Sequence, residues 1–130
     1  MNKFLKSAAN VLEVEYLTLD MAFREVENWC SLMGFGLLVM MENDWLTPIS
    51  IDRFLELTTL RDLEREAFAS FFSRVLKIDR EKVFTARRGE IPQWDSINHL
   101  RLVMEAEQFF GVSYKLEEIP ALEKLEDFLR

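Results

Sequence analysis

The chain has 130 residues, which is enough for one ordinary domain or two very small ones. Hydrophobic residues make up 49% and charged residues 30%, a composition that is typical of folded proteins and excludes wholesale disorder. The net charge of -7 disfavours nucleic acid as a partner, because the phosphate backbone is negative as well.

Cysteine content and hydropathy set the expected compartment. One cysteine cannot form an internal disulfide, and one histidine with one cysteine is too few for a structural zinc site. Glu13 and Glu15 come too early for a secretory signal. The longest apolar run, residues 32–41, is about half of the ~20 residues that span a bilayer. We therefore expect a cytoplasmic protein with no membrane span and no nucleic-acid partner.

The first distinctive element is a helix that follows Ser31. Its residues Leu32–Met41 carry no charge on any side, and a helix that is apolar all round is expected to be buried all round. Gly34 and Gly36 each cost ~1 kcal/mol relative to alanine inside a helix, which predicts that another element packs closely there. We expect this helix to be covered by the second half of the chain, by a second copy in a homodimer, or by a dedicated partner.

A long helix is predicted in the middle of the chain. Thr58 or Thr59 is a good N-cap, and neither proline nor glycine occurs from Leu60 to Ile78. Apolar residues keep helical spacing over this whole stretch. The sequence therefore predicts one continuous helix over residues 59–77.

The second half of the chain also has helical periodicity. After the helix start at Ser96, one apolar stripe is predicted to face the core and the polar side chains between its members to face solvent. The stripe consists of Ile97, Leu100, Val103, Met104 and Phe110, and the solvent-facing set of Asn98, His99, Arg101, Glu105 and Glu107. A short piece at residues 116–119 ends at Pro120, and a last helix carries Leu122, Leu125 and Phe128. No segment alternates long enough to be a strand, so the predicted fold is all-α.

The two halves of the chain are related by an internal repeat. A shift of 65 residues aligns apolar and aromatic positions without a gap, and this is the signature of a duplicated module. The aligned pairs include Trp29/Trp94, Ser31/Ser96, Leu37/Leu102, Glu42/Glu107, Trp45/Phe110, Leu57/Leu122, Leu60/Leu125 and Asp62/Asp127. We predict two tandem four-helix modules, residues 1–63 and 64–130, joined by the shared helix.

The second copy resembles the acyl carrier protein family. The sequence Trp94-Asp95-Ser96-Ile97 opens a helix that runs to Phe110, as the family's Asp-Ser-Leu motif opens its second helix. The resemblance implies a carrier and not an enzyme, with 4′-phosphopantetheine attached to Ser96 and Asp95 assisting its loading. It implies an acyl or aminoacyl thioester as cargo, in fatty acid or secondary metabolite biosynthesis. The implied partners are a phosphopantetheinyl transferase and the loading and synthase enzymes.

Elementary chemistry agrees with this assignment, and an alternative stays open. A phosphodiester on Ser96 would lie at the positive end of a helix, and Asp95 could hold Mg²⁺ together with phosphate oxygens. Asp95 and Ser96 could equally be a simple helix cap.

In the first copy the corresponding serine is Ser31, but Cys30 replaces the aspartate, and a thiol is a poor Mg²⁺ ligand. Ser31 is therefore a second attachment position that we predict to stay unloaded. The rival interpretation of the whole chain is a scaffold or adaptor that keeps the fold and carries no prosthetic group.

Overall fold

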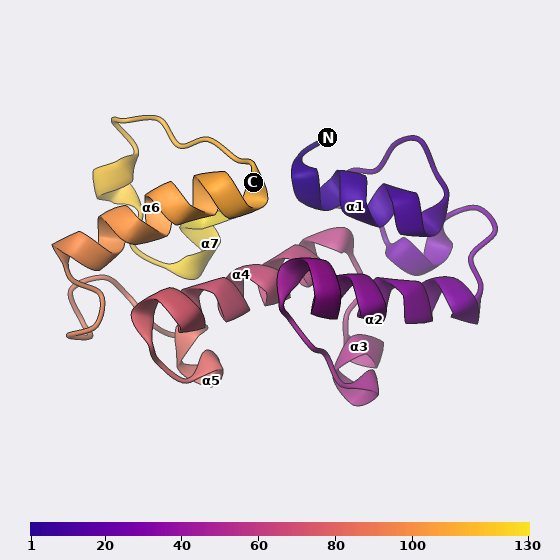
Figure 1. Cartoon of the computed structure of the whole chain (residues 1–130), viewed down its shortest axis with the longest axis horizontal. Coiled ribbons are helices and arrows are strands. Elements are labelled where there is room, and N and C mark those ends of the chain that lie inside the picture. Colours follow the sequence, from indigo (N-terminus) through magenta and orange to yellow (C-terminus); the bar gives the residue numbers. More distant parts are fainter. The chain divides into compact units, whose positions relative to one another are not determined.

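The computed structural model describes all 130 residues and is entirely helical, apart from one isolated antiparallel bridge between Ala22 and Thr59. The predicted all-α class is confirmed. None of the helices combines the length and the apolar character that a membrane span requires. The elements, drawn in Figure 1, are α1 (Lys3–Leu12), η1 (Phe23–Glu25), α2 (Ser31–Trp45), α3 (Ile51–Glu56), α4 (Leu60–Leu76), α5 (Arg80–Val83), α6 (Ser96–Phe110), η2 (Ile119–Ala121) and α7 (Leu125–Phe128).

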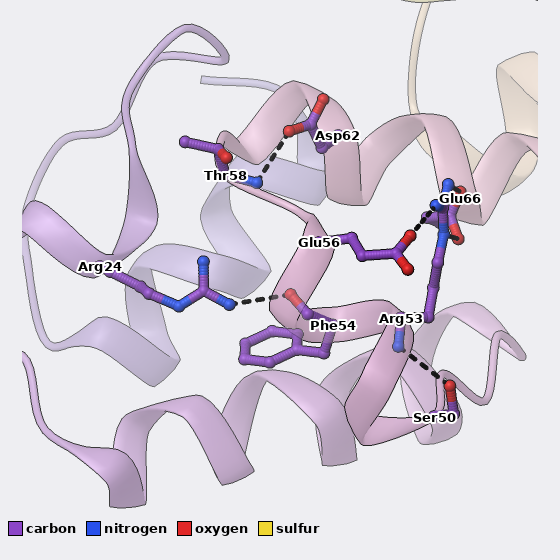
Figure 2. Close-up of polar contacts among 8 residues, drawn as sticks. All are labelled: Arg24, Ser50, Arg53, Phe54, Glu56, Thr58, Asp62 and Glu66. Atoms are coloured by element: carbon purple, nitrogen blue, oxygen red, sulfur yellow. Dashed lines mark hydrogen bonds and ion pairs between the residues drawn. The ribbon is translucent and has the colours of Figure 1, made fainter.

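The chain divides into two units, Met1–Ala67 and Phe68–Arg130, and the division falls within α4. The helix predicted over residues 59–77 is present as α4. Thr59 caps it, because its hydroxyl accepts a hydrogen bond from the Asp62 N–H at 3.2 Å. Asp62 Oδ2 in turn accepts from the N–H groups of Thr58 and Thr59 at 2.9 and 3.0 Å, and the Thr58 contact is drawn in Figure 2.

In the first unit, α1 and α2 lie side by side (Figure 1). A Cβ added at Gly36 would lie only 2.9 Å from Val11 Cγ1, so glycine is what allows α1 to approach. A Cβ at Gly34 would lie 3.3 Å from the Trp29 ring. The packing reason predicted for these two glycines is therefore confirmed.

The core of the second unit is built from aromatic rings. The Phe72 ring meets those of Trp94 and Phe128 edge-on, with centroids 5.5 and 4.9 Å away. Tyr114 packs against Phe128 and donates its hydroxyl hydrogen to the Phe128 carbonyl at 2.6 Å. These contacts hold the residue before the N-cap of α6, Trp94, and the last residue of α7, Phe128, against α4.

Local structure repeats between the two units. Helices α2 and α6 both have 15 residues, and both their first and their last residues are 65 positions apart. Each ends in a left-handed residue, Leu46 with a φ of 53° and Gly111 with a φ of 64°. Asp127 Oδ2 accepts from the N–H groups of Glu123 and Lys124. Asp62 Oδ2 accepts in the same way from the residues four and three positions before it, Thr58 and Thr59. The duplicated sequence positions therefore have matching local roles.

The predicted inward face of α6 is wrong for part of the helix. Ile97, Leu100 and Met104 are 72%, 53% and 64% exposed, whereas the buried residues are His99, Leu102, Val103, Ala106 and Phe110. Both sets have helical spacing. The set that includes His99 can be buried because the His99 ring has two hydrogen-bond partners there, the Trp94 indole and the Ile119 carbonyl.

Within a single chain, residues 32–41 are not buried all round, and their cover by a second copy or a partner stays a prediction. Leu32 and Phe35 are 76% and 64% exposed, while Leu37 and Met41 are fully buried. A bundle of about 60 residues has too little interior to surround a whole helix, so one apolar side of α2 remains on the surface.

Candidate functional site

Ser96 is the first residue of α6, and its side chain is exposed and makes no hydrogen bond within the chain. The preceding residue, Asp95, is the N-cap, with an extended backbone and an Oδ1 atom that accepts from the Asn98 N–H at 2.8 Å. The cap proposed for the Asp-Ser pair is therefore made by Asp95 alone. The Ser96 hydroxyl is left available at the helix N-terminus.

The loop before Ser96 is fixed by hydrogen bonds at both of its edges. The Asn98 side chain donates to the Gln93 carbonyl at 2.7 Å, and the Trp94 N–H donates to the Ile91 carbonyl at 3.2 Å. The Arg88 guanidinium donates to the Pro120 carbonyl, which ties the loop to η2. Ser96 thus stands at the junction of a constrained loop and a capped helix.

His99 is buried one turn after Ser96 and uses both ring nitrogens. Its Nδ1 atom accepts from the Trp94 indole N–H at 3.0 Å, and Nε2 lies 2.8 Å from the Ile119 carbonyl. An indole nitrogen only donates, so Nδ1 is unprotonated and the proton of the neutral ring is on Nε2. Burial lowers the pKa of His99, the Ile119 carbonyl raises it in part, and the positive charge of Arg88 lowers it.

An open cleft of about 610 Å³ lies beside Ser96. Apolar side chains and the His99 ring form most of its wall, and the two ends of the wall come from the loop and from η2. The lining residues are Arg88, Trp94, Ser96, His99, Leu100 and Ile119, with Gly89, Asp95 and Pro120. An extended chain with an apolar portion, attached at Ser96, could lie in this cleft.

The first unit has a corresponding site at the start of α2. Ser31 is the exposed first residue of the helix, and Cys30 is its exposed N-cap, without a side-chain hydrogen bond to the helix. A cleft of about 390 Å³ lies beside it. Seven of its lining residues align with lining residues of the second cleft, namely Arg24, Trp29, Ser31, Gly34, Phe35, Phe54 and Leu55.

Each cleft has an arginine in its lining, Arg24 in the first unit and Arg88 in the second. Arg24 donates to the carbonyls of Phe54 at 2.8 Å and Leu57 at 2.5 Å, and Figure 2 shows the first of these bonds. Arg88 likewise donates to a backbone carbonyl of the second unit, that of Pro120, which aligns with Leu55 and lies next to the position of Phe54. The two sites therefore share their framework and differ chiefly at residues 30 and 95 and at residues 34 and 99.

The structure thus places Asp95 and Ser96 together at one helix start and Cys30 and Ser31 together at another. No three side chains of the histidine, cysteine, aspartate and glutamate types gather closely enough to hold a metal ion. Sequence reasoning missed His99, which it assigned to solvent. The available signal was a Trp-x₄-His spacing, which brings an indole donor to an imidazole across the first turn of a helix.

Comparison with known protein families, curated proteins and solved structures gives no match to this chain.

Proposed function

We propose that this protein is a carrier that holds a 4′-phosphopantetheine arm on Ser96. The proposal is supported chiefly by an exposed serine hydroxyl at the first position of α6, capped by Asp95 and opening onto an apolar cleft. In this proposal the two units are tandem carrier-like four-helix bundles that share α4, and only the second is loaded. The protein is then a shuttle between enzymes and not itself a catalyst.

The residues at the start of α6 suit a phosphodiester. The backbone N–H groups of Ser96 and Ile97 belong to the first turn, where the helix has no carbonyl partners for them, and the helix dipole favours negative charge. Asp95 caps the helix with Oδ1, so Oδ2 can coordinate Mg²⁺ together with phosphate oxygens during loading.

When bound, the arm supplies a terminal thiol that carries an acyl or aminoacyl group as a thioester. The chain's own contribution is shelter and presentation. Trp94, Leu100 and Ile119 line the cleft beside Ser96 with apolar surface, which can exclude water from an arm lying there. The expected partners are a phosphopantetheinyl transferase and the enzymes that load and consume the cargo.

The test is intact-mass analysis after incubation with coenzyme A, Mg²⁺ and a broad-specificity phosphopantetheinyl transferase. The wild type and Ser31→Ala should each gain one phosphopantetheine group, and Ser96→Ala should gain none. Because Ser96 is not the cap, Ser96→Ala should change the free energy of unfolding by no more than ~0.5 kcal/mol. An unmodified wild-type protein, or peptide mapping that puts the group on Ser31, would overturn the proposal.

A second candidate function is a scaffold or adaptor without a prosthetic group. The observation that favours it is the exposed apolar surface of the first unit, where Phe35 of α2 lines the same cleft as Ile51 and Leu55 of α3. This is also the surface through which a homodimer would form. If Ser96→Ala retains biological function while Phe35→Glu abolishes it, the adaptor is the better description. Sedimentation of the wild type against Phe35→Glu tests the homodimer.

A further inference from the structure

The second site differs from the first by a buried ring that links two segments. In the second unit His99 lies between the Trp94 indole and the Ile119 carbonyl, and in the first unit the aligned residue is Gly34. A buried polar group is retained where it is fully hydrogen-bonded, and His99 satisfies this at both nitrogens. This bridge is not needed for the framework, because the first unit forms the same helix and cleft without it.

The geometry points to His99 as a proton-sensitive clamp that positions Ser96. In its neutral form it ties Trp94, two residues before Ser96, to η2; when protonated it releases Trp94 and loosens the start of α6. The positioning of Ser96 rests on the proposed function, whereas the clamp itself does not.

The chemistry makes the release selective. An imidazolium ring carries an N–H on both nitrogens, so protonated Nδ1 would face the Trp94 indole N–H with no acceptor between them. The Ile119 carbonyl would still accept from Nε2. Protonation therefore breaks the Trp94 bond and leaves an unpaired donor pair in a buried place, which costs free energy until the ring or the indole moves.

The charges around His99 make the protonated form unfavourable in place. From the preceding loop, Arg88 is the charged group that acts on the ring, and it repels an imidazolium. Asp95, the N-cap of α6, accepts a hydrogen bond from the Asn98 N–H. Glu118, which directly precedes η2, forms an ion pair with Arg130 at 2.9 Å.

The remaining neighbours of the ring are apolar. Helix α7 presents the Phe128 ring, with its centroid 6.2 Å from that of His99, and α4 contributes Phe72 against Trp94. Of the two acids of α7, Glu126 is exposed and Asp127 accepts from the N–H groups that precede its own helix. No carboxylate hydrogen-bonds to the ring, so release occurs in mild acid, below the ordinary histidine pKa of about 6.5.

The first experiment is an NMR titration of the full-length wild-type protein, which is unambiguous because the chain has one histidine. Near neutral pH the ring should be neutral with its proton on Nε2. As the pH falls, the Trp94 indole N–H should lose its hydrogen-bond shift and its exchange protection at the pH where His99 titrates. The indole signals of Trp29 and Trp45 are internal controls and should not follow. A neutral ring protonated on Nδ1, or a Trp94 signal that ignores the titration, would overturn the clamp.

The second experiment compares the transferase reaction on the wild type and on His99→Asn, whose amide oxygen can accept from Trp94 but cannot titrate. Taking the ratio of the two rates cancels the pH dependence of the transferase. Normalised to its value at about pH 8, the ratio of the wild-type rate to the variant rate should fall several-fold as the pH is lowered into mild acid. A flat ratio would overturn the positioning role.

The two proposals fail in different ways. If neither protein is modified at any pH, the proposed function fails and the positioning role with it, while the wild-type titration still decides the clamp. If His99→Asn does not fold, the wild-type titration of Trp94 by itself decides whether the clamp exists.

Discussion

Helices α2 and α6 occupy corresponding places in the sequence and show which features belong to the framework and which to the chemistry. Both start with an exposed serine, both bury a leucine six residues later, and both expose three apolar residues on the opposite side. The exposed residues are Leu32, Phe35 and Val39 in α2 and Ile97, Leu100 and Met104 in α6. The helices differ at the N-cap, where Cys30 stands against Asp95, and one turn on, where Gly34 stands against His99.

The difference extends to the charge of the two units. The first unit has six basic and 12 acidic side chains, a net charge of -6, and the second has ten basic and 11 acidic ones, a net charge of -1. The arginine beside the first cleft, Arg24, is engaged with backbone carbonyls. A partner for the first unit should therefore carry positive charge around an apolar centre, and a partner for the second need not.

The largest expected effect on stability comes from placing a carboxylate on the buried side of α2 or α6, and the exposed side of the same helices is the comparison. Leu37→Glu and Leu102→Glu put a charge where the wild-type side chain is fully buried, and each should cost on the order of 4 kcal/mol or more. Phe35→Glu and Leu100→Glu change exposed positions and should cost no more than ~0.5 kcal/mol. Urea unfolding of the four variants measures the contrast. If Phe35→Glu is as damaging as Leu37→Glu, the exposed side of α2 is covered in solution and the all-round burial predicted from the sequence is restored.

The same positions show how far sequence reasoning reached. The helical class and the long helix were accessible because they depend on periodicity and on the absence of glycine and proline over many residues. The duplicated module stays a prediction that rests on the 65-residue shift. Which side of α6 faces the core could not be predicted, because two sets of apolar residues have helical spacing. One set is Ile97, Leu100 and Met104, and the other is Leu102, Ala106 and Phe110. At ~100° per residue the two sets lie on opposite sides of the helix, about 150° apart, so either could face the core. Only the tertiary partners decide between them.

The candidate site was predictable only in part. Asp95 and Ser96 were singled out because the sequence around them resembles a family motif, and the helix start at Ser96 follows a local capping pattern. The cleft depends on Arg88, Ile119 and Pro120, which come from separate loops and meet only in the folded unit. His99 was assigned to solvent because its polarity outweighed its spacing from Trp94, and its burial depends on a carbonyl 20 residues away.

A smaller effect on stability is expected at Gly36, where alanine would disturb the close packing of α1 against α2 in the first unit only. Alanine there gains ~1 kcal/mol of helix propensity, but its Cβ would lie 2.9 Å from Val11 Cγ1. The Val11 side chain is stiff about χ1, so α1 must shift to remove the clash. Overpacking of this kind costs ~1–3 kcal/mol of stability. We expect Gly36→Ala to destabilise the protein by ~1 kcal/mol net.

The double variant Val11→Ala/Gly36→Ala is the matched control for this prediction. It removes the clash, so the two substitutions should be clearly non-additive in a double-mutant cycle measured by urea unfolding. Additive effects would show that α1 and α2 are not in close contact at this point.

The prediction that is most informative about function concerns Cys30→Asp, whose expected effect on stability is again small. Cys30 already has an extended N-cap backbone, with φ -150° and ψ 169°, and no side-chain bond to the helix. An aspartate can therefore accept a first-turn N–H of α2 as Asp95 does in α6, which should stabilise the protein by about 1 kcal/mol. Cys30→Ala, which removes the thiol and adds no acceptor, is the control and should show no gain.

Under the proposed function Cys30→Asp should also acquire some phosphopantetheine on Ser31, because that serine is exposed beside its own cleft. Intact mass and peptide mapping after the transferase reaction measure this gain. A variant that is stabilised as expected but still unloaded would show that the acid is not what the first site lacks, and Gly34, which stands where the second unit has His99, would be the next position to exchange.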